Sequence, residues 1–134
     1  MKPVFIFLRH GTIPIQAESQ QRLPSLKKRA LNDNGERQAR AAGMFLQEWL
    51  QENSVTVARL TVARSRRAEQ TAALALPDTP VTGRHALSNA DIFAQLDTLC
   101  AGLPESTAAV HVGHGPPFLA LYRRFDQELV DLSL

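Results

Sequence analysis

The stretch that decides the fold is Val4-Phe5-Ile6-Phe7-Leu8-Arg9-His10-Gly11. Its continuous apolar run ends in a charged pair and a glycine, which is typical of a strand buried on both faces of a parallel sheet. The pattern returns at Ala108–Val112, a second apolar run that leads into Gly113-His114-Gly115. We therefore expect two strands of one sheet, each followed by a histidine and a glycine.

The rest of the chain alternates between strand and helix patterns. Helices are expected from about residue 33 to Glu52 and over Arg66–Leu76, Ala90–Cys100 and Pro116–Phe125, and strands over Val57–Ala63, Pro80–Thr82 and the tail Val130–Leu134. Residues 12–30 show no clean periodicity and are expected to be irregular. The alternation predicts an α/β fold, a three-layer α/β/α sandwich with a mostly parallel central sheet. Ligands of such sheets bind at the carboxyl ends of the strands.

The first predicted helix has both a start signal and a buried stripe. Asn32 or Asp33 can cap it, and Asp33 with Glu36 has the spacing of a capping box. The positions that recur at helical spacing and form its buried stripe are Ala39, Ala42, Leu46, Trp49 and Leu50. Pro77 ends the second helix, and Gly102 lies just beyond the end of the third.

Length and composition exclude several classes of protein. The chain has 134 residues, of which 44% are apolar, and this fits one domain spanning residues 1–134. A single cysteine, Cys100, excludes a disulfide framework and a Cys-rich zinc module. No apolar run approaches the ~18 residues of a membrane span, and the first run stops too early for a signal peptide, so we expect a cytoplasmic protein without a membrane partner.

The charge pattern indicates an anion more than a nucleic acid. A net charge of +2 is too small a surplus to indicate nucleic acid as a partner. Twelve of the 15 basic residues are arginine, whose planar fork of donors matches phosphate and carboxylate. Genome bias also produces Arg-rich chains, so the composition by itself decides nothing.

Several basic residues fall where a ligand would bind. His10 and His114 follow the ends of two predicted strands, and each precedes a glycine that lets the backbone approach a ligand closely. Arg67 opens the helix after a third strand, near amides and a helix dipole that favour an anion. Together with Arg9, these side chains predict a cationic pocket suited to a phosphate dianion.

Such a pocket also changes what the histidines can do. Nearby positive charge disfavours imidazolium, and a neutral imidazole has a free lone pair with which to attack phosphorus. The arginines then stabilise the oxyanions of the transferring group. The residues therefore indicate phosphoryl transfer through a phosphohistidine intermediate.

Four motifs, in order, resemble the histidine phosphatase superfamily, also called phosphoglycerate-mutase-like. They are Leu8-Arg9-His10-Gly11, the helix start Leu31–Ala39 (family pattern Leu-Thr-Asp-x-Gly-x-x-Gln-Ala), Arg67–Ala72 (Arg-Ala-x-Gln-Thr-Ala) and Val112-Gly113-His114-Gly115. Each motif alone is weak, but four in the right order, each at a predicted element boundary, are specific. The resemblance covers most of the chain, whose short length is similar to that of the small SixA-like phosphohistidine phosphatases.

The resemblance implies a metal-independent phosphatase without a cofactor, acting on a phosphorylated small molecule or a phosphoprotein. His10 looks like the nucleophile that becomes phosphorylated. Arg9, Arg67 and His114 look like the groups that clamp the phosphate, and the backbone of Gly11-Thr12 would help to place the phosphoryl group. Water attacking the phosphohistidine would complete a hydrolase cycle.

Some positions depart from the family pattern. Gln16 stands in place of the common Asn and can still donate a hydrogen bond to phosphate, and Ala63-Arg64 replaces the usual Ser-Pro. The position of the family's general-acid Glu holds Asn89, so the nearest carboxylate, Asp91, becomes the candidate acid. Asp91 fits equally well as the cap or first-turn dipole partner of its helix.

Three other interpretations have to be weighed. The missing Glu also fits a non-catalytic phosphate-binding or interaction protein on the same fold. A zinc site made by His10, His111 and His114 is disfavoured, because residues three apart on a strand point to opposite faces. His111 is expected to be a hydrogen-bonded histidine of the core or one that supports the site from behind. Nucleic-acid binding is disfavoured by the small surplus of charge, and Arg64 and Arg66 are expected to be solvated surface charges.

Overall fold

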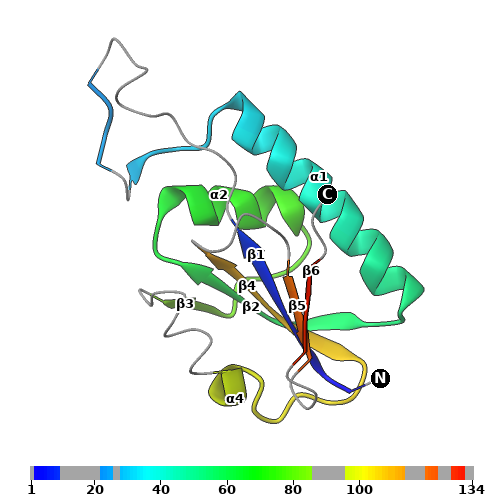
Figure 1. Ribbon diagram of the computed structural model, residues 1–134. Coiled ribbons are helices and arrows are strands. Elements are labelled where there is room, and N and C mark those ends of the chain that lie inside the picture. The colour runs from blue at the N-terminus through cyan, green and yellow to red at the C-terminus, as the bar shows by residue number, and fades with distance from the viewer. Residues whose placement is uncertain are drawn as a thin grey trace.

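The computed structural model describes residues 2–9, 22–25, 28–85, 96–113, 120–123 and 128–131. Its elements, in chain order, are β1 (Val4–Arg9), α1 (Asp33–Glu52), β2 (Thr56–Ala63), α2 (Arg66–Ala75), β3 (Gly83–His85), α4 (Leu96–Leu99), β4 (Thr107–Gly113), β5 (Ala120–Arg123) and β6 (Glu128–Asp131). Strands and helices alternate as far as β4, and two short strands follow (Figure 1).

A six-stranded sheet forms the middle of the molecule, in the order β3-β2-β4-β1-β5-β6. The first four of these strands are parallel, because β2 pairs in parallel with β3 and β4, and β4 pairs in parallel with β1. β5 and β6 extend the sheet beyond β1 as antiparallel strands. Helices flank the sheet (Figure 1), so the predicted α/β fold with a mostly parallel sheet is confirmed.

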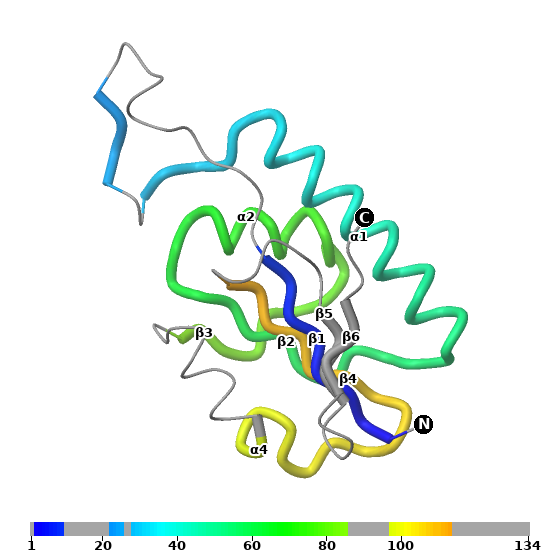
Figure 2. Tube along the Cα trace, viewed as in Figure 1, coloured from blue at the N-terminus to red at the C-terminus, as the bar shows by residue number. Residues whose placement is uncertain are grey.

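Alternation along the strands sends side chains to two faces of the sheet. On one face, Ile6 and Leu8 of β1 belong to a core cluster with Leu46 of α1 and Ala72 of α2. Figure 2 shows α1 and α2 running side by side over this face. The opposite face receives the residues of the other parity, among them Phe7, which is fully buried. The apolar run that opens the chain is therefore buried on both faces, as its pattern predicted.

The start of α1 follows one of the two predicted capping schemes. Asn32 is the cap, and its Oδ1 accepts a hydrogen bond of 2.8 Å from the N–H of Gly35. The predicted capping box of Asp33 and Glu36 is wrong, because Asp33 already lies inside the helix. Glu36 instead pairs with Arg40 one turn later, at 3.8 Å.

The predicted stripe of α1 is buried with one exception. Ala39, Ala42, Leu46 and Leu50 are buried, and Gly43 is buried with them. Trp49 packs against the edge of the core and is only half-buried. Because Gly43 has no side chain, α1 approaches α2 closely there, and a Cβ at this position would lie 2.5 Å from Ala75 O.

The predicted strand at Pro80–Thr82 is wrong by three residues, since β3 begins only at Gly83. Pro80 has no N–H to contribute to a strand ladder. Thr82 is hydrogen-bonded to Leu60 of β2 but precedes the paired residues of β3. Its N–H donates to Leu60 O at 2.7 Å, and its Oγ1 donates to Leu60 O and accepts from Leu60 N–H, at 3.1 Å each. Pairing in register then starts with Gly83 opposite Thr61.

The helix expected over Pro116–Phe125 is also wrong where the chain is described, because Ala120–Arg123 form β5. This strand pairs with Val4–Phe7 of β1, whose outer edge would otherwise present unpaired N–H and C=O groups. Pairing with a free strand edge thus outweighs the local helix pattern.

The remaining expectations concern the third helix and the tail. Of the helix expected over Ala90–Cys100, the described part is α4, and Gly102 follows it with a φ of 72°. Of the tail strand, the described part is β6 at the edge of the sheet. Residues 90–95 and 132–134 lie outside the described residues.

Candidate active site

The carboxyl ends of β1 and β4 lie side by side in the sheet. The two strands pair in parallel, and their register places Arg9 opposite Gly113. Paired strands are about 4.8 Å apart, so the residues that directly precede His10 and His114 are neighbours. His10 and His114 themselves lie outside the described residues. The two strands that lead into His10 and His114 therefore end at adjacent positions of the carboxyl edge.

Arg9 ends β1 with an exposed side chain. Because side chains alternate along a strand, Arg9 shares a face with Phe7 and points away from the face that α1 and α2 cover. Within the described part of the chain, no hydrogen bond or ion pair engages its guanidinium. The exposed side chain of Arg9 therefore lies at the carboxyl edge of the sheet.

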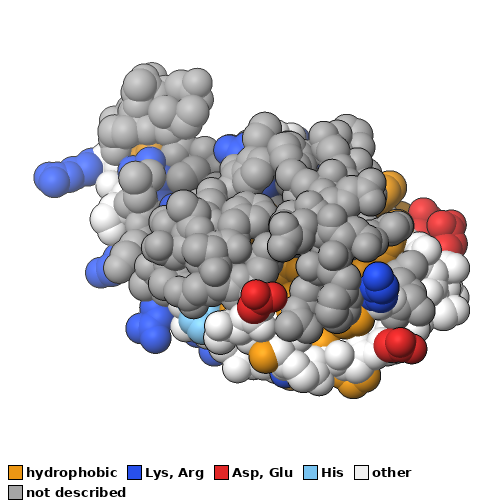
Figure 3. All heavy atoms as spheres, turned by 60° about the horizontal axis from the view of Figure 1, so that its bottom comes forward, with side chains coloured by type: hydrophobic (Ala, Val, Ile, Leu, Met, Phe, Trp, Pro, Cys, Tyr) orange, Lys and Arg blue, Asp and Glu red, His pale blue; other side chains and the backbone are white. Residues whose placement is uncertain are grey.

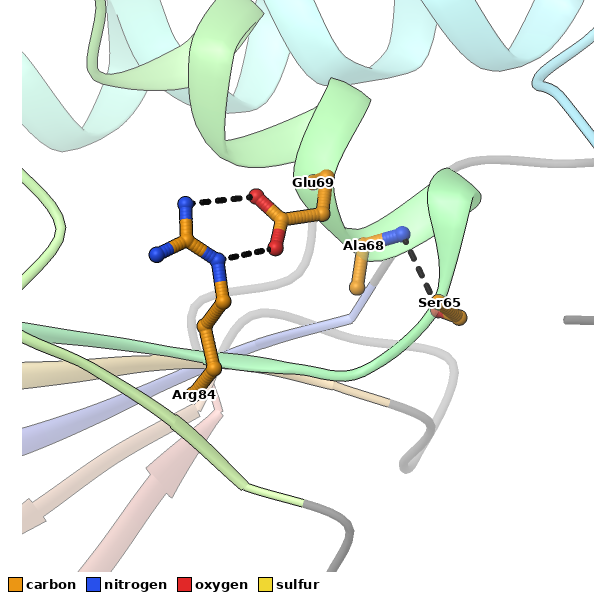
Figure 4. Close-up of polar contacts among 4 residues, drawn as sticks. All are labelled: Ser65, Ala68, Glu69 and Arg84. Carbon is orange, nitrogen blue, oxygen red and sulfur yellow. Dashed lines mark hydrogen bonds and ion pairs between the residues drawn. The ribbon is translucent and has the colours of Figure 1, made fainter. Parts of the chain in front are cut away.

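Arg67 lies in the first turn of α2, directly after the carboxyl end of β2. Ser65, which was not among the predicted caps, caps this helix by accepting a hydrogen bond of 3.3 Å from the N–H of Ala68 (Figure 4). Arg67 is half-buried, and burial, followed by the positive charge of Arg29, lowers the pKa of its guanidinium. A partly desolvated cation thus stands at a helix N-terminus, where backbone amides already favour an anion.

Arg29 brings a second guanidinium to this helix start. Its Nε and Nη2 donate to Pro24 O at 3.3 and 3.0 Å. Two residues later, the N–H of Leu31 donates to Oε1 of Gln70 in α2 at 2.7 Å. Sequence reasoning missed Arg29, because it belongs to no periodic pattern and only the folded chain brings its charge to Arg67.

The acidic residue of the α2 start is paired with β3. Glu69 accepts hydrogen bonds from Nε and Nη2 of Arg84, at 2.5 and 3.4 Å (Figure 4). These bonds and the charge of Glu69 raise the pKa of Arg84. The pair ties α2 to the edge strand β3.

Basic side chains gather at the carboxyl edge of the sheet. Those with exposed side chains at this edge, among the described residues, are Arg9, Arg64, Arg66 and Arg84, whereas the exposed Lys2 lies at the amino end of β1. Exposed carboxylates such as Glu52, Asp78 and Glu105 lie at the other end of the strands. In Figure 3, Lys and Arg side chains are most frequent on the left, the side on which the parallel strands end in Figure 1, and others lie at the top and on the right. Around this edge the exposed charged side chains of the described strand ends are thus mainly basic, which favours an anion there.

His111 is a buried residue of β4, two positions before the carboxyl end of the strand at Gly113. It is 1% exposed, its Nδ1 lies 2.8 Å from Thr61 Oγ1, and its ring packs on Phe7 with centroids 5.6 Å apart. The prediction of a hydrogen-bonded core histidine is confirmed. The ring reaches toward the strand end, because a Cβ added to Gly113 would lie 2.8 Å from Nε2 of His111.

Gly113→Ala is therefore expected to lower the free energy of unfolding by about 1–3 kcal/mol, since the new methyl overpacks a buried ring. Gly83→Ala is the matched control on β3, where the nearest atom would lie at 3.5 Å. Urea unfolding of both variants, and of Gly113→Ala in a His111→Ala background, measures the effect. The penalty should vanish without the ring. A penalty that persists there would mean that His111 does not cause it.

The described residues include only part of the predicted site. Arg9 and Arg67 both lie at the carboxyl edge, as predicted. The predicted site residues outside the described part of the chain are His10, Gly11, Thr12, Gln16, Asp91 and His114.

A hollow of about 430 Å³ lies away from this edge. It is lined by residues of α1, the start of β2 and the end of α2, among them Gln47, Val57 and Thr79. None of the predicted site residues lines it, so this hollow does not belong to the candidate site.

Two features are absent from the part of the chain that the structure describes, namely residues 2–9, 22–25, 28–85, 96–113, 120–123 and 128–131. None of their helices combines the length and apolar character needed to cross a membrane. No three His, Cys, Asp or Glu side chains among them come together as a set of metal ligands. His111, one of the three histidines of the zinc alternative, directs its Nδ1 to Thr61.

A comparison with protein families matches residues 5–96 to the histidine phosphatase superfamily (branch 1). The match contains three of the four sequence motifs, and the fourth, around His114, lies beyond it. No curated protein matches the chain.

Solved structures share the fold at low sequence identity. A candidate phosphohistidine phosphatase SixA from Nakamurella multipartitia is 23% identical with a TM-score of 0.58, and the match covers 85% of this chain and 60% of that one. The protein histidine phosphatase SixA complexed with tungstate is 18% identical with a TM-score of 0.65, over 96% and 93% of the two chains. Phosphoserine phosphatase from Entamoeba histolytica, in complex with 3-phosphoglyceric acid, is 14% identical with a TM-score of 0.64, over 98% and 95%.

Proposed function

Because the chain belongs to the histidine phosphatase superfamily, we propose that it hydrolyses a phosphomonoester or phosphoprotein through a phosphohistidine intermediate on His10. The observation that carries the proposal is the parallel register that pairs Arg9 with Gly113. It starts the segments of His10 and His114 from adjacent positions, where one phosphoryl group can meet both rings.

The proposed reaction has two displacement steps. A ring nitrogen of neutral His10 attacks phosphorus, the bond from phosphorus to the leaving-group atom breaks, and Asp91 is the candidate donor of a proton to that atom. Water then attacks the phosphohistidine, the N–P bond breaks, and the proton that water loses returns to the carboxylate of Asp91. Inorganic phosphate leaves, and His10 regains its lone pair.

The cationic groups hold the phosphoryl oxygens in both steps. Arg9, Arg67 and His114 are the proposed clamp, and the backbone of Gly11-Thr12 and the amide of Gln16 complete it. The half-buried position of Arg67 supports this role, because a partly desolvated guanidinium forms stronger charge-assisted hydrogen bonds than a fully solvated one. The exposed, basic carboxyl edge supports it by attracting a dianion.

The proposed partner is a phosphorylated small molecule or a phosphoprotein. The names of the structural relatives span both classes, since one is a protein histidine phosphatase and another is a phosphoserine phosphatase. All these substrates present the same phosphate dianion to the clamp, so the proposed chemistry is common to both classes.

A second candidate function is phosphate binding without catalysis. It is favoured by Asn89, which stands where the family carries a general-acid Glu, and by Ala63-Arg64 in place of Ser-Pro. A site without the acid would hold phosphate but would leave poor leaving groups attached.

Capture of the intermediate separates the two functions. Protein incubated with p-nitrophenyl phosphate and quenched in alkali is expected to carry the added mass of one phosphoryl group, because phosphohistidine survives alkali and decomposes in acid. Intact-protein mass spectrometry before and after acid treatment measures this. Release of p-nitrophenol should continue in EDTA, since every proposed clamp group belongs to the chain. Binding of phosphate with neither adduct nor turnover would establish the second candidate instead.

A further inference from the structure

The turn before α1 holds Arg29 in one place. The N–H of Lys28 donates to Ser25 O at 3.0 Å, which closes the turn. Arg29 then donates from both Nε and Nη2 to Pro24 O, at 3.3 and 3.0 Å. Two N–H groups on one acceptor fix the plane of a guanidinium, whose fork is already rigid. The turn therefore presents a positive charge in a set orientation.

The same turn is fastened to the start of α2. Leu31, which is 7% exposed, donates its N–H to Oε1 of Gln70 at 2.7 Å. Gln70 lies three residues after Arg67 on α2, and residues three apart share a helix face. The segment that carries Arg29 is therefore anchored to the helix face that carries Arg67. The effect of Arg29 on the pKa of Arg67 is consistent with this placement.

Two guanidiniums beside one helix N-terminus form an electrostatically unfavourable group of like charges. The two side chains repel each other, and the helix dipole adds positive potential at the same place. An anion with several oxygen atoms reverses the sign of these interactions, because each guanidinium can then donate charge-assisted hydrogen bonds. A phosphoryl group has this chemistry.

We propose that Arg29 is a substrate-binding residue that donates, together with Arg67, to oxygens of the transferred phosphoryl group. The proposal rests on the proposed function, because it takes the phosphoryl group at the carboxyl edge as the ligand. It extends the predicted clamp by a residue that belongs to no recognised motif. The competing explanation is that Arg29 only holds the turn through Pro24 O.

Replacement of the charge tests the proposal. Arg29→Met removes the charge and keeps most of the side-chain length, and Lys28→Met makes the same kind of change at the adjacent exposed position. Titration calorimetry with inorganic phosphate should show affinity reduced at least about tenfold by Arg29→Met, the size expected for lost charge-assisted hydrogen bonds. Lys28→Met should stay within about twofold, as for an exposed charge. With p-nitrophenyl phosphate, Arg29→Met should raise KM more than it lowers kcat.

Arg29→Lys keeps the charge without the fork and decides the question if Arg29→Met fails to fold. It should weaken phosphate binding by roughly threefold or more, since a point charge replaces a bidentate donor. Phosphate affinity within twofold of the unmodified protein in the folded Arg29 variants would overturn the role of Arg29, even if their melting temperatures fell. If the unmodified protein forms the phosphohistidine adduct in that case, the proposed function still stands. An unmodified protein that neither binds phosphate nor forms the adduct would overturn both.

Discussion

His10→Ala is expected to lower kcat/KM for p-nitrophenyl phosphate by roughly a thousandfold or more, the scale seen when a covalent nucleophile is removed. Alanine has no lone pair to attack phosphorus, so the pathway through phosphohistidine closes. The alkali-stable, acid-labile adduct should disappear together with turnover. Inorganic phosphate should still bind, because Arg9 and Arg67 remain.

The matched control is His85→Ala. His85 ends β3 and belongs neither to the proposed clamp nor to the buried core. This variant should retain turnover within about twofold of the unmodified protein, as for a surface substitution away from the chemistry. Equal rates in both variants would show that His10 is not the nucleophile.

Gly43→Val is expected to cause the largest loss of stability, about 3 kcal/mol or more. A Cβ at Gly43 would lie 2.5 Å from the carbonyl oxygen of Ala75 and 2.7 Å from its Cα, so the clash is with backbone of α2 rather than with a movable side chain. α1 and α2 would have to move apart, opening the core cluster that Leu46 and Ala72 share. The denaturation midpoint in urea, read by far-UV circular dichroism, measures the loss.

Met44→Val provides the control on the same helix. Met44 is 70% exposed, so the substitution changes little beyond helix propensity, and its cost should stay below about 1 kcal/mol. Equal midpoints for Gly43→Val and Met44→Val would contradict the close approach of the two helices. A much lower midpoint for Gly43→Val alone would support it.

Elements with long, strong patterns were predictable, whereas short ones were not. The apolar runs of β1 and β4 and the twenty-residue periodicity of α1 each repeat one signal many times. β3 has three residues and β5 has four, so neither carries enough local signal to outweigh a competing pattern. Their positions depend on partners far along the chain, Thr61–Ala63 for β3 and Val4–Phe7 for β5.

The candidate site divides in the same way. The positions of Arg9 and Arg67 at the carboxyl edge were predictable, because the sequence marks the end of β1 at Arg9 and the start of α2 beside Arg67. Arg29 was not, since its neighbourhood comes from the folded turn and from the bond between Leu31 and Gln70. The cap Ser65 was not predicted, although a serine directly before a helix is a common start signal.

The sequence by itself determined the α/β class, the main strands and helices, and the family, because these depend on the spacing of residues close together in the chain. Only the tertiary structure decided that Arg9 pairs with Gly113, that Ala120–Arg123 form a strand, and that the charge of Arg29 lowers the pKa of Arg67. The physical reason is that hydrophobic period and capping are local properties. Strand register and the meeting of two like charges are set by contacts between segments that are distant in sequence.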